Sequence, residues 1–281
     1  MTSTSPAQRR PARFRPALPS TLTRTSGLGL GISMLWFSLL VLIPLCAVVI
    51  TASEGGWANF WRAITNAQTR SAIVLTLEAA VAVTAVNVVV GTVIAWVLVR
   101  DRFPGKGVLE VVIDSPFALP TIVAGLVLLS LYGKDDSPLG INVANSGASV
   151  YLAFLFVTLP FVVRMVQPVL EELDLEVEEA AASLGASRFT TFRRVILPSL
   201  TPAITAGAAL SFARAVGEYG SLVLLSGNLP FTSEVASVRI LSAIENDNPE
   251  AAASIATLLL LVSLATIVVL DLLQRRISDR G

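Results

Sequence analysis

Six long apolar runs, separated by shorter polar segments, dominate the pattern of residues along the chain. A helix needs about 20 apolar residues to cross the hydrocarbon core of a bilayer. The runs cover roughly residues 28–51, 72–99, 109–132, 149–168, 203–226 and 252–272. The composition agrees, because 54% of the residues are hydrophobic and only 14% are charged. We therefore predict an all-α integral membrane protein with six transmembrane helices, embedded in a lipid bilayer.

Basic residues fall mainly on one side of this six-span arrangement. That side collects the N-terminal arginines, the C-terminal arginines and the basic residues of the loops after the second and fourth spans. The opposite side holds only Arg62, Arg70, Lys134 and Arg239. Because basic loops are retained in the cytoplasm, we expect both termini and the loop after the fourth span to be cytoplasmic.

The ends of the chain differ from the apolar middle. Residues 1–27 mix five arginines with Ser, Thr and Pro, a composition typical of a disordered tail. The predicted organisation is a cytoplasmic tail over residues 1–27, a six-helix transmembrane domain over residues 28–276 and a short C-terminal tail over residues 277–281.

Composition argues against several functional classes. The 20 basic and 20 acidic residues cancel, so no positive excess exists to neutralise the phosphates of a nucleic acid. The chain has no histidine and one cysteine, which leaves few metal ligands or general bases. It also lacks a phosphate-binding glycine loop with its lysine. We predict no catalytic, cofactor or metal site, and we expect ATP to be hydrolysed by another subunit.

A polar interval at about residues 171–200 stands between the fourth and fifth spans. Helix-forming residues run from Leu173 to Leu184, and Gly185 stands where a helix would end in a left-handed cap. Apolar and arginine residues then alternate at helical spacing until Pro198. The interval predicts a helix-turn-helix elbow with small residues at an exposed corner. It is either a docking element for a partner or only a structured loop.

The fifth span combines small and charged residues. Ala209, Ala213 and Gly217 recur every four residues, a spacing that permits close helix contact in lipid. A second face carries four polar residues, and its two charged members can pair one helical turn apart. This face either lines a translocation pathway or forms a purely structural ion pair. Its members are Ser211, Arg214, Glu218 and Ser221.

Two further segments carry structural expectations. Pro116 and Pro120 each remove a backbone donor from the third span, which predicts a bend and a candidate hinge. After the fifth span, amphipathic spacing between residues 235 and 244 predicts a short helix on the outer membrane face.

The elbow resembles the EAA loop of permease subunits in bacterial ABC importers. The resemblance implies a type I importer permease fold, in which this loop is the coupling helix that docks into a cleft on the cytoplasmic ATP-binding subunit. The residues that match the motif are Glu179, Ala180, Ala181, Gly185, Leu197 and Pro198.

Three other segments resemble the sulfate and thiosulfate importer permeases, and most of all their T-type subunit. These are Asp114–Gly125, Ala213–Ser221 and Thr232–Ala236. The resemblance implies an importer of the bacterial plasma membrane that moves the anion by alternating access. It implies three kinds of partner: two copies of an ATP-binding subunit, a second homologous permease and an extracytoplasmic sulfate-binding protein.

Other functions stay open at this stage. Molybdate or tungstate importer permeases share the element Gly217–Gly220, so this element alone does not identify the anion. A secondary anion transporter would use carboxylates near the bilayer midplane, where Glu218 is the one acidic candidate. A membrane scaffold without transport activity would also explain six spans and an exposed elbow.

Overall fold

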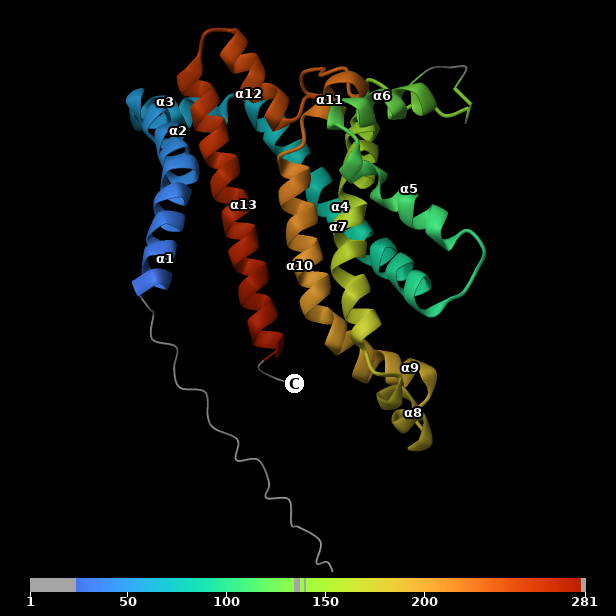
Figure 1. Cartoon of the computed structure of the whole chain (residues 1–281). Coiled ribbons are helices and arrows are strands. Elements are labelled where there is room, and N and C mark those ends of the chain that lie inside the picture. The colour runs from blue at the N-terminus through green and yellow to red at the C-terminus, as the bar shows by residue number, and fades with distance from the viewer. Residues whose placement is uncertain (1–23, 134–136, 139, 279–281) are drawn as a thin grey trace, which may run out of the picture. The chain divides into compact units, whose positions relative to one another are not determined.

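The computed structural model describes residues 24–133, 137–138 and 140–278, and every regular element among them is helical (Figure 1). Most of the predicted N-terminal tail, residues 1–23, and residues 279–281 lie outside this description. Contacts between residues divide the chain into two units, with the boundary between Ala47 and Val48. Each unit is described by itself.

The described part of the first unit is the beginning of an apolar helical run, up to Ala47. α1 (Arg24–Phe37) leads through a π-helical turn, η1 (Ser38–Leu42), into α2 (Ile43–Glu54). The run Ser26–Glu54 is long and apolar enough to cross a membrane, as predicted for the first span. Its large apolar side chains between Leu28 and Ile43 are exposed, a surface that suits lipid. Four residues assigned to the tail, 24–27, belong to this helix.

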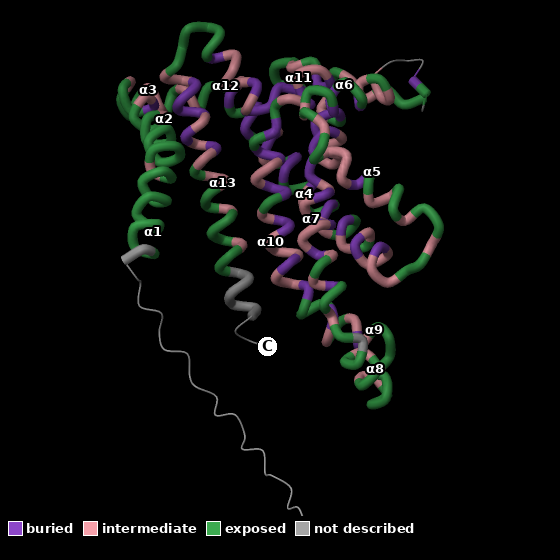
Figure 2. Tube along the Cα trace, viewed as in Figure 1, coloured by how far each residue is buried: buried purple, intermediate pink, exposed green. Residues whose placement is uncertain are grey.

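The second unit is built on four long helices. These are α4 (Ala67–Arg100), α7 (Gly147–Glu172), α10 (Leu197–Val216) and α13 (Pro249–Ser278). α4, α7 and α10 pack against one another, and α13 packs against α10. Each of the four helices carries buried residues (Figure 2). Together with the first run, these four account for five membrane spans.

Two glycines allow α4 and α10 to approach α7 at the same residue. A Cβ added at Gly91 would lie 2.9 Å from the Val162 Cβ, and one added at Gly207 would lie 3.0 Å from the Val162 Cα. Small residues permit such approach between membrane helices, where dispersion contacts replace the hydrophobic effect. The buried face of α10 therefore follows Ala203, Gly207, Ser211 and Ala215. The predicted stripe of Ala209, Ala213 and Gly217 lies on a more exposed face.

We expect Gly207→Leu to destabilise the helix bundle by about 1–3 kcal/mol, because the new side chain meets backbone atoms of α7 that cannot move aside. The melting temperature of the purified protein in detergent measures this effect. Gly107→Leu is the matched control, since no atom lies within 4 Å of a Cβ at that position. Equal melting temperatures for the two variants would contradict the packing described here.

The third predicted span is not one kinked helix. α5 (Lys106–Ala118) and α6 (Thr121–Tyr132) are separated by Leu119 and Pro120 and are bent by 120° relative to each other. Pro120 has no N–H to continue the hydrogen-bond ladder, and it forces the preceding residue into an extended conformation. The pair is therefore a broken span or a re-entrant loop, which gives five spans, or six if the pair counts as one.

The fifth span was also placed too far along the chain. The apolar helical run is Arg188–Val216, and it comprises α9 (Arg188–Thr191), the π-helical turn η2 (Phe192–Ile196) and α10. Residues 217–219 break the helix, and α11 (Gly220–Leu225) follows as a separate short helix. α11 packs against α6 so closely that a Cβ on Gly125 would lie 2.5 Å from the Ser221 carbonyl oxygen.

Short helices gather at both ends of the second unit. α3 (Gly56–Thr65), α6, α11 and α12 (Ala236–Glu245) lie at one end (Figure 1). α12 confirms that the segment after the fifth span forms a short helix. α8 (Leu175–Ser183) and α9 lie at the opposite end. The predicted elbow is therefore separated from α3 and α12 by the length of the bundle.

Candidate functional site

The elbow has the helix and glycine turn that its sequence predicts. α8 begins after Asp174, whose side chain accepts a hydrogen bond from the Glu176 N–H at 3.0 Å. It ends in a left-handed turn at Gly185, where φ is +85°. The N–H groups of Gly185 and Ala186 then donate to the carbonyls of Ala182 and Ala181. Glycine adopts this conformation without a steric penalty.

The second half of the elbow differs from the prediction in one respect. Pro198 does not interrupt the chain between the elbow and the fifth span, because α9, η2 and α10 form one helical run. Within the π-helical turn, the Leu197 N–H donates to the carbonyl of Phe192, five residues earlier. This wider register precedes Pro198, which lacks the N–H that a regular helix would need there.

The elbow exposes an apolar surface. The side chains of Leu184 and Phe189 are 89% and 71% exposed. A groove of about 610 Å³ runs beside Phe189, with Trp96 and Phe192 among the residues that line it. Five of the six motif residues are exposed, and Ala181 is half-buried. Large apolar side chains exposed together on a polar segment are typical of an interaction site.

The last turn of α4 ties the elbow to the bundle. Arg100 forms an ion pair with Glu178 of α8, and its guanidinium carbon lies 5.5 Å from the ring centroid of Trp96. The Trp96 ring in turn meets Phe192 edge-on, with centroids 5.8 Å apart. This ion pair could not be predicted from the sequence, because its two residues lie 78 positions apart and no local pattern joins them.

A double-mutant cycle tests this attachment. We expect Arg100→Gln and Glu178→Gln to be coupled by about 0.5–3 kcal/mol in the free energy of unfolding, because each variant removes the same ion pair. The cycle of Arg102→Gln with Glu178→Gln is the control, since Arg102 is exposed and outside the pair. Coupling of the same size in both cycles would show that the Arg100 contact contributes nothing specific.

Three of the four polar residues predicted on the fifth span come together where α10 ends. Glu218 is 1% exposed, and its Oε1 accepts hydrogen bonds from the N–H and the hydroxyl of Ser221 at 2.9 and 2.8 Å. Its Oε2 lies 2.5 Å from Nη1 of Arg214. Ser237 of α12 donates to the Glu218 carbonyl at 2.6 Å. Glu218 therefore fixes the break between α10 and α11.

Ser211 does not join this cluster. It lies on the buried face of α10, and its hydroxyl has no hydrogen-bond partner among the described residues. Helical spacing predicts one face that carries Ser211, Arg214, Glu218 and Ser221. Because α10 ends at Val216, Glu218 and Ser221 do not continue the face on which Ser211 lies. Arg214 and Glu218 do form the predicted ion pair, and their burial differs, at 31% and 0% side-chain exposure.

The candidate hinge lies between two fixed attachments. On one side, Arg164 of α7 donates from Nε and Nη2 to both carboxylate oxygens of Asp114 in α5, at 2.7 and 2.5 Å. On the other side, α6 packs against α11 through Gly125. Pro116 lies inside α5 and Pro120 at the start of α6. The prolines therefore occupy a sharp joint whose two arms contact different helices.

Comparisons with known proteins agree with this architecture. Residues 87–280 match the family described as "Binding-protein-dependent transport system inner membrane component". The chain is 43% identical over 259 residues to the sulfate transport system permease protein CysT of Salmonella typhimurium, covering 90% of this chain and 94% of that protein. It is 44% identical over 250 residues to the CysT protein of Synechocystis, covering 87% of both. It is also 44% identical over 264 residues to a probable CysT protein of Chlorokybus atmophyticus, covering 92% of both.

Solved structures share the fold at low sequence identity. The crystal structure of a bacterial ABC transporter that imports alginate matches with a TM-score of 0.73 and 14% identity, covering 89% of this chain and 94% of that chain. The chain also matches the crystal structure of an alginate transporter in complex with its periplasmic protein, which holds an alginate pentasaccharide. This match has the same coverage, a TM-score of 0.74 and 15% identity. The resemblance found in the sequence is confirmed: the chain belongs to the binding-protein-dependent transport system inner membrane components, the permease subunits of ABC importers, and is a relative of the sulfate permeases.

Proposed function

We propose that this chain is the T-type permease subunit of an ATP-driven sulfate and thiosulfate importer in the bacterial plasma membrane. The observation that carries the proposal is the 43% identity to a sulfate permease along 90% of the chain. Such similarity over nearly full length favours the same anion over molybdate or tungstate. The alginate transporters, at 14–15% identity, support the fold only. The proposed substrate rests on the sulfate permeases.

The proposed importer needs partners on both sides of the membrane. A binding protein delivers the anion outside, as the family description and the complex of the alginate transporter suggest. Two copies of an ATP-binding subunit and a second homologous permease complete the assembly. The excess of basic residues on one side supports cytoplasmic termini, and it puts the elbow on the side where ATP is available.

The elbow supports a route by which ATP could drive the permease. The exposed Leu184 and Phe189 offer apolar anchors for a cleft on the ATP-binding subunit. The elbow continues into Arg188–Val216, a run of 29 residues that is about 44 Å long at 1.5 Å per residue. A displacement of the elbow would therefore reach Arg214 near the far end of this run, and through its ion pair Glu218 just beyond it.

Alternating access then requires that ATP bind one arrangement of the helices more tightly than the other. In this proposal the joint at Pro116–Pro120 allows α5 and α6 to move with different neighbours. The Arg214–Glu218 pair keeps the end of α10 joined to α11 during that movement. Arg214 retains an exposed edge, but Glu218 neutralises its charge, so we propose a structural role for the pair and not a tight anion site.

Uptake of radiolabelled sulfate tests the function. Cells that lack this chain should lose sulfate uptake and recover it when the chain is restored. Unlabelled thiosulfate should compete, and molybdate should compete weakly. If cells that lack this chain took up sulfate normally but lost uptake of labelled molybdate, the substrate of the importer would be molybdate. Uptake that persists without the ATP-binding subunit would favour a secondary transporter.

A further inference from the structure

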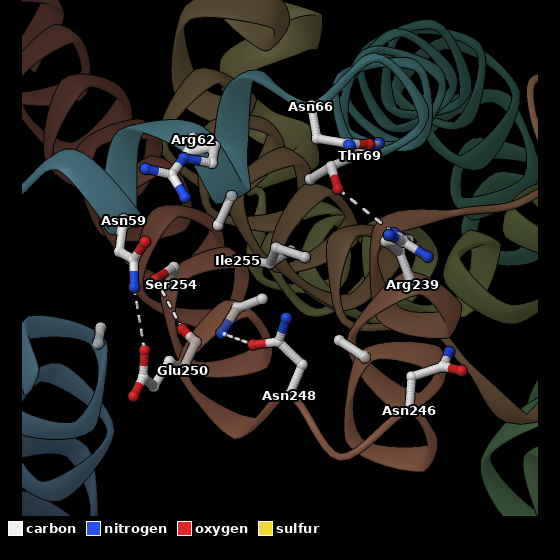
Figure 3. Close-up of a pocket in the computed structure, with 14 residues that line it drawn as sticks. Asn59, Arg62, Asn66, Thr69, Arg239, Asn246, Asn248, Glu250, Ser254 and Ile255 are labelled. Atoms are coloured by element: carbon white, nitrogen blue, oxygen red, sulfur yellow. Dashed lines mark hydrogen bonds between the residues drawn. The ribbon is translucent and has the colours of Figure 1, made fainter. Parts of the chain in front are cut away.

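A polar pocket of about 270 Å³ lies at the end of the second unit opposite the elbow (Figure 3). Most of its lining comes from two pairs of helices, α3 with the start of α4 and α12 with the start of α13, and Ala52 of α2 completes it. Its walls carry side chains that are mostly polar and include two cations and one anion. Those that matter for its chemistry are Asn59, Arg62, Asn66, Arg239, Asn248 and Glu250.

Both helical pairs use an asparagine at the point where the long helix begins. The Asn66 side-chain oxygen accepts from the N–H groups of Gln68 and Thr69, at 3.1 and 3.4 Å. The Asn248 oxygen accepts from the Ala251 N–H at 3.0 Å. Each oxygen is therefore committed to its own helix, and the amide NH₂ group keeps its donors. The two asparagines therefore cap the helices that form the pocket walls, and their side-chain oxygens are already used as acceptors.

Two arginines reach the pocket from opposite sides. Figure 3 shows Arg62 coming from α3 and Arg239 from α12. The Arg239 Nε donates to the Thr69 hydroxyl at 3.3 Å, which orients its guanidinium group. Among the described residues, neither Arg62 nor Arg239 has an ion-pair partner. Within the described part of the chain, neither guanidinium group is paired directly with a carboxylate.

The remaining charge in the pocket is Glu250. Its Oε2 accepts a hydrogen bond from the Asn59 Nδ2 at 3.2 Å. Two arginines against one glutamate leave the walls with one positive charge in excess. The arginines therefore decide which ligand the pocket favours.

We propose that this pocket binds a free tetrahedral oxyanion. Guanidinium groups bind oxyanions through pairs of parallel hydrogen bonds, and amide donors can satisfy the remaining oxygens. The pocket is far larger than the roughly 30 Å³ that one water occupies in the liquid, so a small oxyanion fits with part of its hydration shell. The inference that the ligand is an anion rests on the two arginines alone. Its identification as sulfate rests on the proposed function. The site would hold the anion on the face opposite the elbow before it passes between the helices.

Binding to the purified importer complex, without the binding protein, tests the site. Sodium sulfate is titrated calorimetrically at constant ionic strength, with sodium chloride as the reference. We expect saturable sulfate binding that Arg62→Gln and Arg239→Gln each weaken by about tenfold or more, since each removes a charge-assisted contact. Arg62 is exposed, so its replacement should leave folding intact even if Arg239→Gln does not fold.

Two further variants sharpen the test. Arg70→Gln removes an exposed arginine in the first turn of α4 that does not line the pocket, so it should leave binding unchanged. Glu250→Gln removes the repelling charge and should tighten binding several-fold. Absence of saturable binding above the chloride reference, or equal affinities for the native protein, Arg62→Gln and Arg239→Gln, would overturn the proposal.

Uptake assays separate this inference from the proposed function. Normal sulfate uptake by a complex that shows no sulfate binding in the calorimeter would leave the importer intact and overturn the pocket. Saturable sulfate binding that depends on Arg62, in a chain that supports no sulfate uptake, would support the pocket and overturn the function. If Arg62→Gln weakened docking of the binding protein and left sulfate binding unchanged, the pocket would be a docking site and the proposal would be wrong.

Discussion

Glu179→Lys should lower ATP-driven anion uptake by about tenfold or more, because it reverses a charge at the proposed docking surface, and mismatched charges at an interface cost several kcal/mol. Glu179 is exposed on α8, and its carboxylate forms no ion pair among the described residues. The fold should therefore tolerate the change. Uptake of labelled sulfate, normalised to the amount of the chain in the membrane, measures the loss. Glu172→Lys, at another exposed carboxylate that ends α7 and is not one of the motif residues, is the matched control.

Two other elbow variants distinguish docking from folding. Leu184→Glu removes an apolar anchor that is 89% exposed, so it should uncouple uptake without lowering the melting temperature. Gly185→Val should lower both, because its φ of +85° strains a branched side chain although the space around it is open. Normal uptake by Glu179→Lys and Leu184→Glu together would show that the elbow does not couple this permease to ATP.

Glu218→Ala should cause the second large effect, a loss of about 2–4 kcal/mol in the free energy of unfolding. The substitution deletes the acceptor for two Ser221 hydrogen bonds and leaves Arg214 without its partner at the end of α10. The estimate lies below that for a fully buried pair because Arg214 is 31% exposed. Thermal unfolding in detergent, together with the amount of protein in the membrane, measures the change.

Conservative variants show how Glu218 acts. Glu218→Gln keeps one oxygen that can accept from Ser221 and loses only the charge, so it should cost less than Glu218→Ala. The double variant Arg214→Gln with Glu218→Gln should be more stable than Glu218→Gln alone, because no charge is then left unpaired. Glu245→Ala, at the exposed end of α12, serves as control. A Glu218→Ala protein as stable as this control would refute the structural role of the pair.

Local features of the fold could be predicted from the sequence. The helix that ends at Gly185 follows from helix-forming residues before a glycine, and both effects act within a few residues. Most of the membrane spans follow from length and hydrophobicity in the same way. Glu179 lies on α8 and Pro198 in the first turn of α10, and the coupling role of the motif residues stays a prediction.

Features that depend on distant residues could not be predicted. The end of α10 at Val216 depends on Glu218 meeting Ser221 and Ser237, and apolar residues on both sides concealed the break. The attachment of α5 to α7 depends on Asp114 and Arg164, which are 50 positions apart. The pocket is a similar case. Arg62 and Arg239 entered the sequence analysis only as the few basic residues of the outer side, because only the fold brings α3 and α12 together.

Accumulation of labelled sulfate in vesicles tests whether this chain is a permease that ATP drives through the elbow. The chain is reconstituted with its partner permease and the ATP-binding subunits, ATP is supplied on the elbow side, and the loaded binding protein is supplied on the other side. The account predicts accumulation that requires both ATP and binding protein and that Glu179→Lys abolishes. Accumulation that continues without ATP, or that Glu179→Lys leaves unchanged, would contradict it.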